Sequence, residues 1–134
     1  RFIMIFVFGS NEAGIHGAGA AAQALKEHGA KWGAGVGLVG SSYAIPTKNK
    51  TIDTLPLEDI KKYVEGFVIN TKMNDMFTYY LTDIGCGLAG YTEEQIAPMF
   101  MDIDRNVVIS DKFAAVLEKC GKDMSAWPVY TYEG

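Results

Sequence analysis

The sequence predicts an α/β domain with a mixed, mostly parallel sheet. Short runs of β-branched and aromatic residues alternate with helical segments along the chain, which is typical of that class. The first apolar run, Phe2–Phe8, is continuously hydrophobic, as expected for a central strand that helices cover on both faces. The 134 residues of the chain contain no repeat, low-complexity tract or linker, so we expect residues 1–134 to form a single domain.

Residues 8–21 contain a glycine-rich loop that follows this first strand. The loop leads into an alanine-rich helix, expected over Ala18–His28 and ended by Gly29. Glycines let a backbone approach a ligand closely, and the first N–H groups of a helix have no partner within it. Together they favour an anion site for a phosphate or pyrophosphate. The alternative is a tight turn in which glycine serves packing only. The loop lacks the Gly-Lys-Ser/Thr end of a P-loop, and its glycine spacing is wrong for a dinucleotide fingerprint.

The next segments are expected to be a connector and a short strand. Residues 33–42 are rich in glycine, which cannot sustain a helix and indicates a mobile or ligand-facing loop. Residues 43–46 form a short apolar run that we expect to end at Pro46, and residues 47–50 then read as a polar turn.

The central part of the chain predicts a helix, a strand and a second glycine loop. Pro56 is suited to the first position of a helix. One face of that helix is apolar, formed by Leu57, Ile60, Val64, Phe67 and Val68. Residues 76–82 are typical of a strand, and the glycine-rich residues 83–91 follow it.

The remaining segments predict two more helices and two strands. Thr92 and Gln95 form a capping box for a helix that ends near Phe100. Residues 107–109 indicate a strand, and Ser110 is a good cap for a helix that ends near Gly121. Residues 128–132 predict a terminal strand. The sequence assigns no functional role to residues 104–134.

Both glycine-rich loops follow strands and precede helices. In an open α/β sheet, ligands bind beyond the carboxyl ends of the strands. We therefore expect the two loops to meet at one edge and to hold a diphosphate from two sides, with residues 85–90 offering successive backbone N–H groups. Tyr91 either stacks on a ring or ribose of the ligand or packs beneath the loop.

Several motifs follow one another as they do in macro domains. They are Asn11, residues 16–21 (His-Gly-Ala-Gly-Ala-Ala), residues 43–48 (Tyr-Ala-Ile-Pro-Thr-Lys) and residues 84–88 (Ile-Gly-Cys-Gly-Leu). The chain resembles the terminal ADP-ribose protein glycohydrolases and, more closely, small phage and bacterial macro-like proteins often described as phage non-structural proteins. The resemblance covers residues 5–100. It implies a three-layer α/β/α sandwich that binds ADP-ribose or a related nucleotide.

The two loops and the resemblance together define the expected ligand-binding residues. No metal site and no cofactor besides the nucleotide itself are expected. The expected binding residues are Gly9, Ser10, Asn11, His16, Gly17, Ala18, Gly19, Gly85, Cys86, Gly87, Leu88, Ala89, Gly90 and Tyr91.

Two departures from the family pattern bear on catalysis. The chain has no match to the Gly-Asp-Ile segment whose Asp contacts adenine. Lys48 matches the lysine of the glycohydrolases, but Ala89 stands where those enzymes carry an Asp. Lys48 is therefore a phosphate contact, a surface lysine, or a nucleophile that needs a lowered pKa and an unidentified helper. Asn11 either orients the distal ribose or closes an Asx turn. Lys48 and Asn11 are the candidate catalytic residues.

Other polar residues are expected to be structural. Asp83 is the nearest carboxylate to the second loop and is expected to be an exposed residue at a strand end. His16 is a loop cap or a general acid, and the structural reading is preferred. Cys86 is expected to be a small buried residue rather than a nucleophile, and His28 and Cys120 are expected to be structural or incidental.

Charge and cysteine content limit the function classes. The net charge of −4 argues against a general nucleic-acid binder. Two cysteines form no disulfide framework, and no stretch predicts a membrane span, so a bacterial or host cytosolic protein is expected. The resemblance to macro domains implies a protein that binds or sequesters an ADP-ribose-derived nucleotide. The alternatives are an ADP-ribosyl hydrolase acting on a protein, nucleic acid or metabolite, and a structural phage component without a ligand. The oligomeric state is not indicated.

Overall fold

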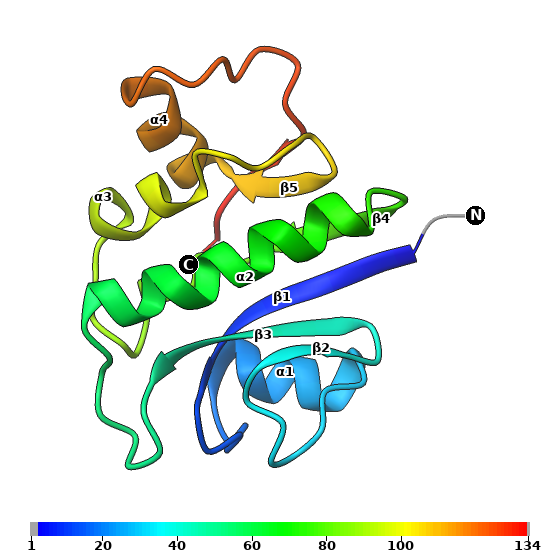
Figure 1. Cartoon of the computed structure of the whole chain (residues 1–134), viewed down its shortest axis with the longest axis vertical. Helices are drawn as coiled ribbons and strands as arrows, with labels where there is room; N and C mark the ends of the chain where they lie inside the picture. The colour runs from blue at the N-terminus through cyan, green and yellow to red at the C-terminus, as the bar shows by residue number, and fades with distance from the viewer. Residues whose placement is uncertain (1–2, 134) are drawn as a thin grey trace.

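In the computed structural model, which describes residues 3–133, six strands form one sheet in the order β2-β3-β1-β4-β5-β6 (Figure 1). All neighbouring strands run parallel except β2 and β3. The mixed, mostly parallel sheet expected from the sequence is therefore confirmed. The elements in chain order are β1 (Ile3–Asn11), α1 (Gly19–Glu27), β2 (Gly37–Val39), β3 (Ser42–Lys48), α2 (Leu57–Met73), β4 (Phe77–Leu81), α3 (Glu93–Ile96), the 3₁₀ helix η1 (Ala97–Phe100), β5 (Val107–Ser110), α4 (Asp111–Lys119) and β6 (Val129–Tyr130).

β1 lies at the centre of the sheet, between β3 and β4. Its side chains alternate between two cores: Ile5 and Val7 join the larger one, and Phe6 and Phe8 join the smaller one. The expected central strand is confirmed from Ile5 onward, while Phe2 lies outside the described residues. Helices cover both faces, with α2 and α1 on opposite sides of the sheet (Figure 1). The structure thus has three layers.

The larger core lies between the sheet and the helices α2, α3, η1 and α4. Phe67 of α2 is at its centre and makes edge contacts with Tyr43, Tyr79 and Phe100, at ring-centroid distances of 5.1, 5.6 and 6.0 Å. The predicted apolar face of α2 packs here. Ser110 caps α4 as expected, because its Oγ accepts a hydrogen bond of 3.0 Å from the Phe113 N–H.

The smaller core lies under α1, where small side chains bring the helix close to the sheet. Ala21 and Ala24 of α1 pack with Phe6 and Phe8. The same face continues as an aromatic stack toward the C-terminal strand, since the rings of Tyr80 and Tyr130 are stacked at 4.3 Å. This stack fixes Tyr130 of β6 against Tyr80 of β4.

Two expectations about residues 33–48 are wrong. Residues 37–39 form β2 rather than loop, and β3 continues through Pro46 to Lys48. β2 begins at Gly37, which pairs with Ala44. The β2 pairing covers Ser42 to Ala44 only, and within the described residues β3 then meets only an isolated bridge between Lys48 and Thr54 on its outer side. Pro46 lies outside both, where a proline is tolerated.

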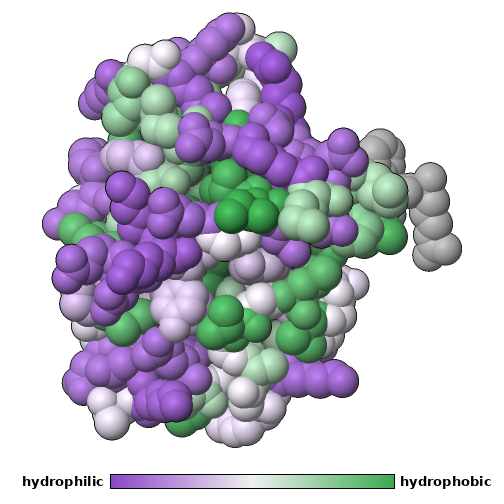
Figure 2. Space-filling model, in the orientation of Figure 1, coloured by the Kyte–Doolittle hydropathy of each residue, from purple (hydrophilic) through white to green (hydrophobic). Residues whose placement is uncertain are grey.

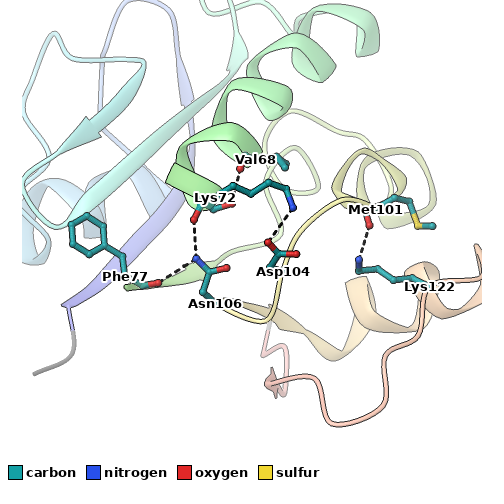
Figure 3. A network of polar contacts seen from close by, with 8 residues as sticks. Val68, Lys72, Phe77, Met101, Asp104, Asn106 and Lys122 are labelled. Atoms are coloured by element: carbon teal, nitrogen blue, oxygen red, sulfur yellow. Dashed lines mark hydrogen bonds and ion pairs between the residues drawn. The ribbon is translucent and has the colours of Figure 1, made fainter. Parts of the chain in front are cut away.

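A polar network lies where the end of α2 meets the segment before β5 (Figure 3). The Asn106 amide donates to the Thr71 carbonyl oxygen at 3.0 Å, which ties the end of α2 to the segment before β5. Lys72 forms an ion pair with Asp104 at 3.1 Å. On the side of α2, apolar patches interrupt the polar surface (Figure 2), and Ile69 and Met73 are among the exposed apolar residues of this helix. None of the helices within residues 3–133 is long and apolar enough to cross a membrane.

Candidate functional site

A cleft of about 630 Å³ lies at the carboxyl ends of β1, β3 and β4 and at the N-terminus of α1. Both glycine-rich loops reach this edge of the sheet, as expected for strands that are followed by helices. The residues that line the cleft are Gly9, Ser10, Asn11, Ile15, Gly17, Ala18, Gly19, Ala20, Ala21, Gln23, Thr47, Lys48, Ile52, Thr82, Asp83, Ile84, Gly85, Gly87, Leu88, Ala89 and Tyr132.

The end of β3 carries a bulge that belongs to the cleft. Ser10 pairs with Pro46 but Asn11 pairs with Lys48, so Thr47 is the extra residue on β3. The Thr47 hydroxyl donates to the Ser10 carbonyl oxygen at 3.3 Å. A bulge changes the direction of the side chains that follow it, and Lys48 comes directly after this one and lines the cleft.

Asn11 closes the first loop. Its Oδ1 accepts from the Ile15 N–H at 2.9 Å, and its Nδ2 donates to the Ile15 carbonyl oxygen at 2.8 Å. The side chain therefore fixes the loop, although it bonds to the residue four positions on and not two positions on as in an Asx turn. It also lines the cleft. The connector supports this loop from the side away from the cleft, since Ser10 Oγ donates to the Gly35 carbonyl oxygen. None of residues 33–42 lines the cleft, so this connector does not face it.

The N-terminus of α1 has no cap from its own sequence. Ala18 occupies the N-cap position and makes no side-chain hydrogen bond, and the first turn holds no acidic residue. The unpaired N–H groups of this turn and the positive end of the helix dipole are therefore available to an anion. Residues 18–21 line the cleft.

Two glycines of the cleft have no structural reason to be glycine. A Cβ atom added at Gly17 or Gly87 would meet no atom within 4 Å, and neither residue has a left-handed φ. Gly19 is equally open, although its φ of +58° favours glycine. A glycine that neither packing nor backbone conformation requires leaves room for another molecule to approach the backbone closely.

The second loop rests on α3 and on the segment before α2. Gly85 has a φ of +79°, and a Cβ there would lie 2.9 Å from Ile96 Cδ1. The Tyr91 hydroxyl donates to the Leu55 carbonyl oxygen at 2.6 Å, so Tyr91 packs beneath the loop. The Thr54 hydroxyl donates to the Ala89 carbonyl oxygen at 3.0 Å. The loop is thus held on the side opposite the cleft.

Four of the expected binding residues do not line the cleft: His16, Cys86, Gly90 and Tyr91. His16 is buried, its Nε2 lies 3.1 Å from the Ala34 carbonyl oxygen, and its ring edge packs on Phe8. Burial raises the pKa of the Cys86 thiol to about 12, and nearby carboxylates add to the rise. The thiol is therefore neutral at physiological pH and a poor nucleophile.

Asp83 is the residue that the sequence analysis misjudged. It was expected to be exposed, but it is only 8% exposed, and neither carboxylate oxygen has a hydrogen-bond partner among the described residues. Burial raises its pKa to about 6. The Ser110 hydroxyl opposes part of this rise without forming a hydrogen bond to either oxygen, and Glu93 adds to it. Its position between Leu81 and Ile84, both buried, was a weak signal of this burial.

Tyr132 is another of the lining residues that sequence reasoning missed. Its backbone N–H donates to Asp111 Oδ1 at 3.0 Å, and Lys112 Nζ lies 4.5 Å from its ring centroid. It joins the cleft because β6 pairs with β5, and no local pattern indicates such a placement.

Charges are few in this cleft. Among the described residues that line it, Lys48 is the only basic residue and Asp83 the only acidic one. Ala89 lines the cleft without supplying a carboxylate. No group of three or more His, Cys, Asp or Glu within residues 3–133 is arranged to hold a metal ion.

Comparison with known protein families, curated proteins and solved structures finds no match for this chain.

Proposed function

We propose that this protein is macro-domain-like, of phage or bacterial origin, and that it binds and sequesters ADP-ribose or a related nucleotide in the cleft. The diphosphate lies between residues 14–19 and residues 85–90. The observation that carries this proposal is the pair Gly17 and Gly87, which line the cleft and are open on their side-chain side without a structural need for glycine. Backbone N–H groups at such positions can contact phosphate oxygens directly.

The size and lining of the cleft support a nucleotide. A volume of about 630 Å³ is within the range of small-molecule sites. Three apolar side chains at the cleft, Ile15, Ile52 and Leu88, are exposed, and Leu88 is 75% exposed. Such side chains cover the flat faces of a base or a sugar, while the α1 N-terminus favours the anionic part of the ligand.

Hydrolysis of an ADP-ribosyl bond is the second candidate function. It is favoured by Lys48, which lines the same cleft as Asp83. A lysine nucleophile must be uncharged to attack the anomeric carbon, and Ala89 provides no carboxylate at the position used by the resembled glycohydrolases. Binding without turnover is therefore the preferred proposal.

The test is calorimetric titration of ADP-ribose into wild type and Gly87→Val, followed by mass analysis of the recovered ligand. A valine side chain would occupy the space of the diphosphate, so we expect affinity to fall about 10- to 100-fold with an unchanged melting temperature. Gly66→Val on α2 is the matched control, because Gly66 is equally open and does not line the cleft.

Three results would contradict the proposal. Equal affinity in wild type and Gly87→Val would show that the diphosphate does not contact the loop at residues 85–90. A complete lack of binding by wild type would favour a structural component without a ligand. Release of ADP-ribose from an ADP-ribosylated protein or nucleic acid would make the protein a hydrolase.

A further inference from the structure

We propose that Asp83 accepts hydrogen bonds from two neighbouring hydroxyl groups of a ribose and thereby sets the orientation of the ligand in the cleft. This inference rests on the proposed binding of a ribonucleotide. It adds a recognition residue outside the glycine loops and a requirement for an unmodified ribose diol.

The first step is the missing partner. Buried polar groups in folded proteins almost always have a hydrogen-bond partner. Asp83 is more than nine-tenths buried and lines the cleft, yet both Oδ1 and Oδ2 lack a partner among the described residues. Such an unpaired carboxylate is costly to the fold. Both oxygens are closed to solvent in this structure, so a donor in the cleft removes that cost once the Asp83 side chain turns its oxygens toward it.

The second step is the chemistry of the partner. A carboxylate only accepts hydrogen bonds, and its two oxygens can accept from two donors at once. A phosphate would be repelled by its charge. No metal-binding group of three or more His, Cys, Asp or Glu exists in the part of the chain that the structure describes. Two adjacent hydroxyls supply two neutral donors at a spacing that suits both oxygens. Asp83 is therefore matched to the sugar, and the α1 N-terminus to the phosphates.

The third step is the rigidity of Asp83. The preceding Thr82 hydroxyl donates to the Val7 carbonyl oxygen at 2.6 Å, which fixes the end of β4 on β1. The Asp83 carbonyl oxygen accepts from the Cys86 N–H at 3.2 Å, which closes the following turn. The backbone of Asp83 is thus held on both sides, so its position at the end of β4 is fixed.

Tyr132 completes this side of the cleft. It lines the cleft together with Asp83, and its backbone is anchored on Asp111. An aromatic ring beside an acceptor provides an apolar surface for the face of a sugar while the hydroxyl groups reach the carboxylate.

The experiment is a calorimetric comparison of wild type, Asp83→Asn and the exposed control Asp75→Asn. The ligands are ADP-ribose, its 2′-deoxy form, ADP, AMP and ribose 5-phosphate. We expect Asp83→Asn to weaken ADP-ribose binding about 10- to 100-fold, since a hydrogen bond to a charged group is lost. Asp75→Asn should bind as wild type does. Thermal melting shows whether each variant is folded.

The deoxy and truncated ligands identify which ribose is bound. If the adenosine ribose is bound, the 2′-deoxy form loses affinity in wild type and loses much less in Asp83→Asn. If the terminal ribose is bound, ADP shows this behaviour instead. Asp83→Asn could instead weaken ADP-ribose binding while neither the 2′-deoxy form nor ADP shows this behaviour. That result would overturn the inference, because another donor group would then be the partner of Asp83.

The outcomes separate this inference from the proposed function. If ADP-ribose binds wild type and Asp83→Asn equally, only the role of Asp83 is overturned. If ADP-ribose does not bind but AMP or ribose 5-phosphate binds in an Asp83-dependent way, the proposed ligand is wrong and the role of Asp83 stands. If wild type binds none of these ribose-bearing ligands, both are overturned.

Discussion

Two sets of glycines that look alike in the sequence have different structural environments. In the connector, a Cβ at Gly35 would overlap the Asn11 carbonyl oxygen, and one at Gly40 would lie 2.8 Å from the Gly29 carbonyl oxygen. At Gly17 and Gly87 a Cβ would meet nothing within 4 Å. The first set allows backbones to pack against one another, and the second leaves space in the cleft. The comparison separates glycines that backbone packing requires from glycines that neither packing nor backbone conformation requires.

The largest expected effect is on the stability of the protein, at a glycine that backbone packing requires. Gly35→Ala should destabilise the protein by about 3 kcal/mol, because the added methyl group must displace the backbone of the first loop. Denaturant unfolding measures this change, and Gly66→Ala, at an open helical position, is the control. An unfolding midpoint equal to that of wild type would show that the connector does not support the loop through close packing.

At a glycine that lines the cleft, we expect the reverse: little change in stability and a large loss of affinity. Gly17→Val should change the free energy of unfolding by less than about 0.5 kcal/mol, because its side-chain space is open. The same change should weaken ADP-ribose binding about 10- to 100-fold. Calorimetry and thermal melting of one preparation give both values. If Gly17→Val is destabilised but binds ADP-ribose normally, Gly17 belongs with the glycines that backbone packing requires.

Asp83 predicts a pH dependence of stability. Its pKa is about 6 in the folded protein, raised by burial from 3.8, so the folded state binds the proton more tightly than the unfolded state. Stability from this group is therefore gained as pH falls through about 6 and is complete below about 4. Above pH 6 the charged form should cost on the order of 1 to 2 kcal/mol, since water in the cleft screens part of the shift.

Asp83→Asn isolates this dependence from other carboxylates. The variant should be more stable than wild type at pH 8, and the difference should shrink as the pH is lowered to 4. Denaturant unfolding at several pH values measures it. A constant difference between the two proteins across this range would mean that Asp83 does not titrate as described.

The smallest effect is expected at Lys48. If it contacts a phosphate, Lys48→Ala should weaken ADP-ribose binding about fivefold, and Lys50→Ala, which is exposed and does not line the cleft, should not. Borohydride should trap no covalent adduct with ADP-ribose on wild type. An adduct that forms on wild type and is absent from Lys48→Ala would make Lys48 a nucleophile and the protein an enzyme.

Much of the site was predictable because it depends on strand order and local pattern. The continuous hydrophobicity of residues 5–8 predicted a central strand, and the position of each glycine loop between a strand and a helix predicted a common edge. Of the expected binding residues, the ones that line the cleft are Gly9, Ser10, Asn11, Gly17, Ala18, Gly19, Gly85, Gly87, Leu88 and Ala89. The role of Tyr91 was left open, and its packing beneath the loop depends on its contact with Leu55.

The sequence by itself determined most of the helices and strands, the cap of α4 and the edge of the sheet at which the loops meet, because these follow from hydrophobic periodicity and from hydrogen bonds between residues close in the chain. Only the tertiary structure decided that Asp83 is buried and that Tyr132 joins the cleft. Both outcomes depend on β5, α4 and β6, which lie far along the chain and which pack against the end of β4. Burial is a property of neighbours in space, so a strand-end aspartate has no local feature that distinguishes an exposed carboxylate from an unpaired one inside a cleft.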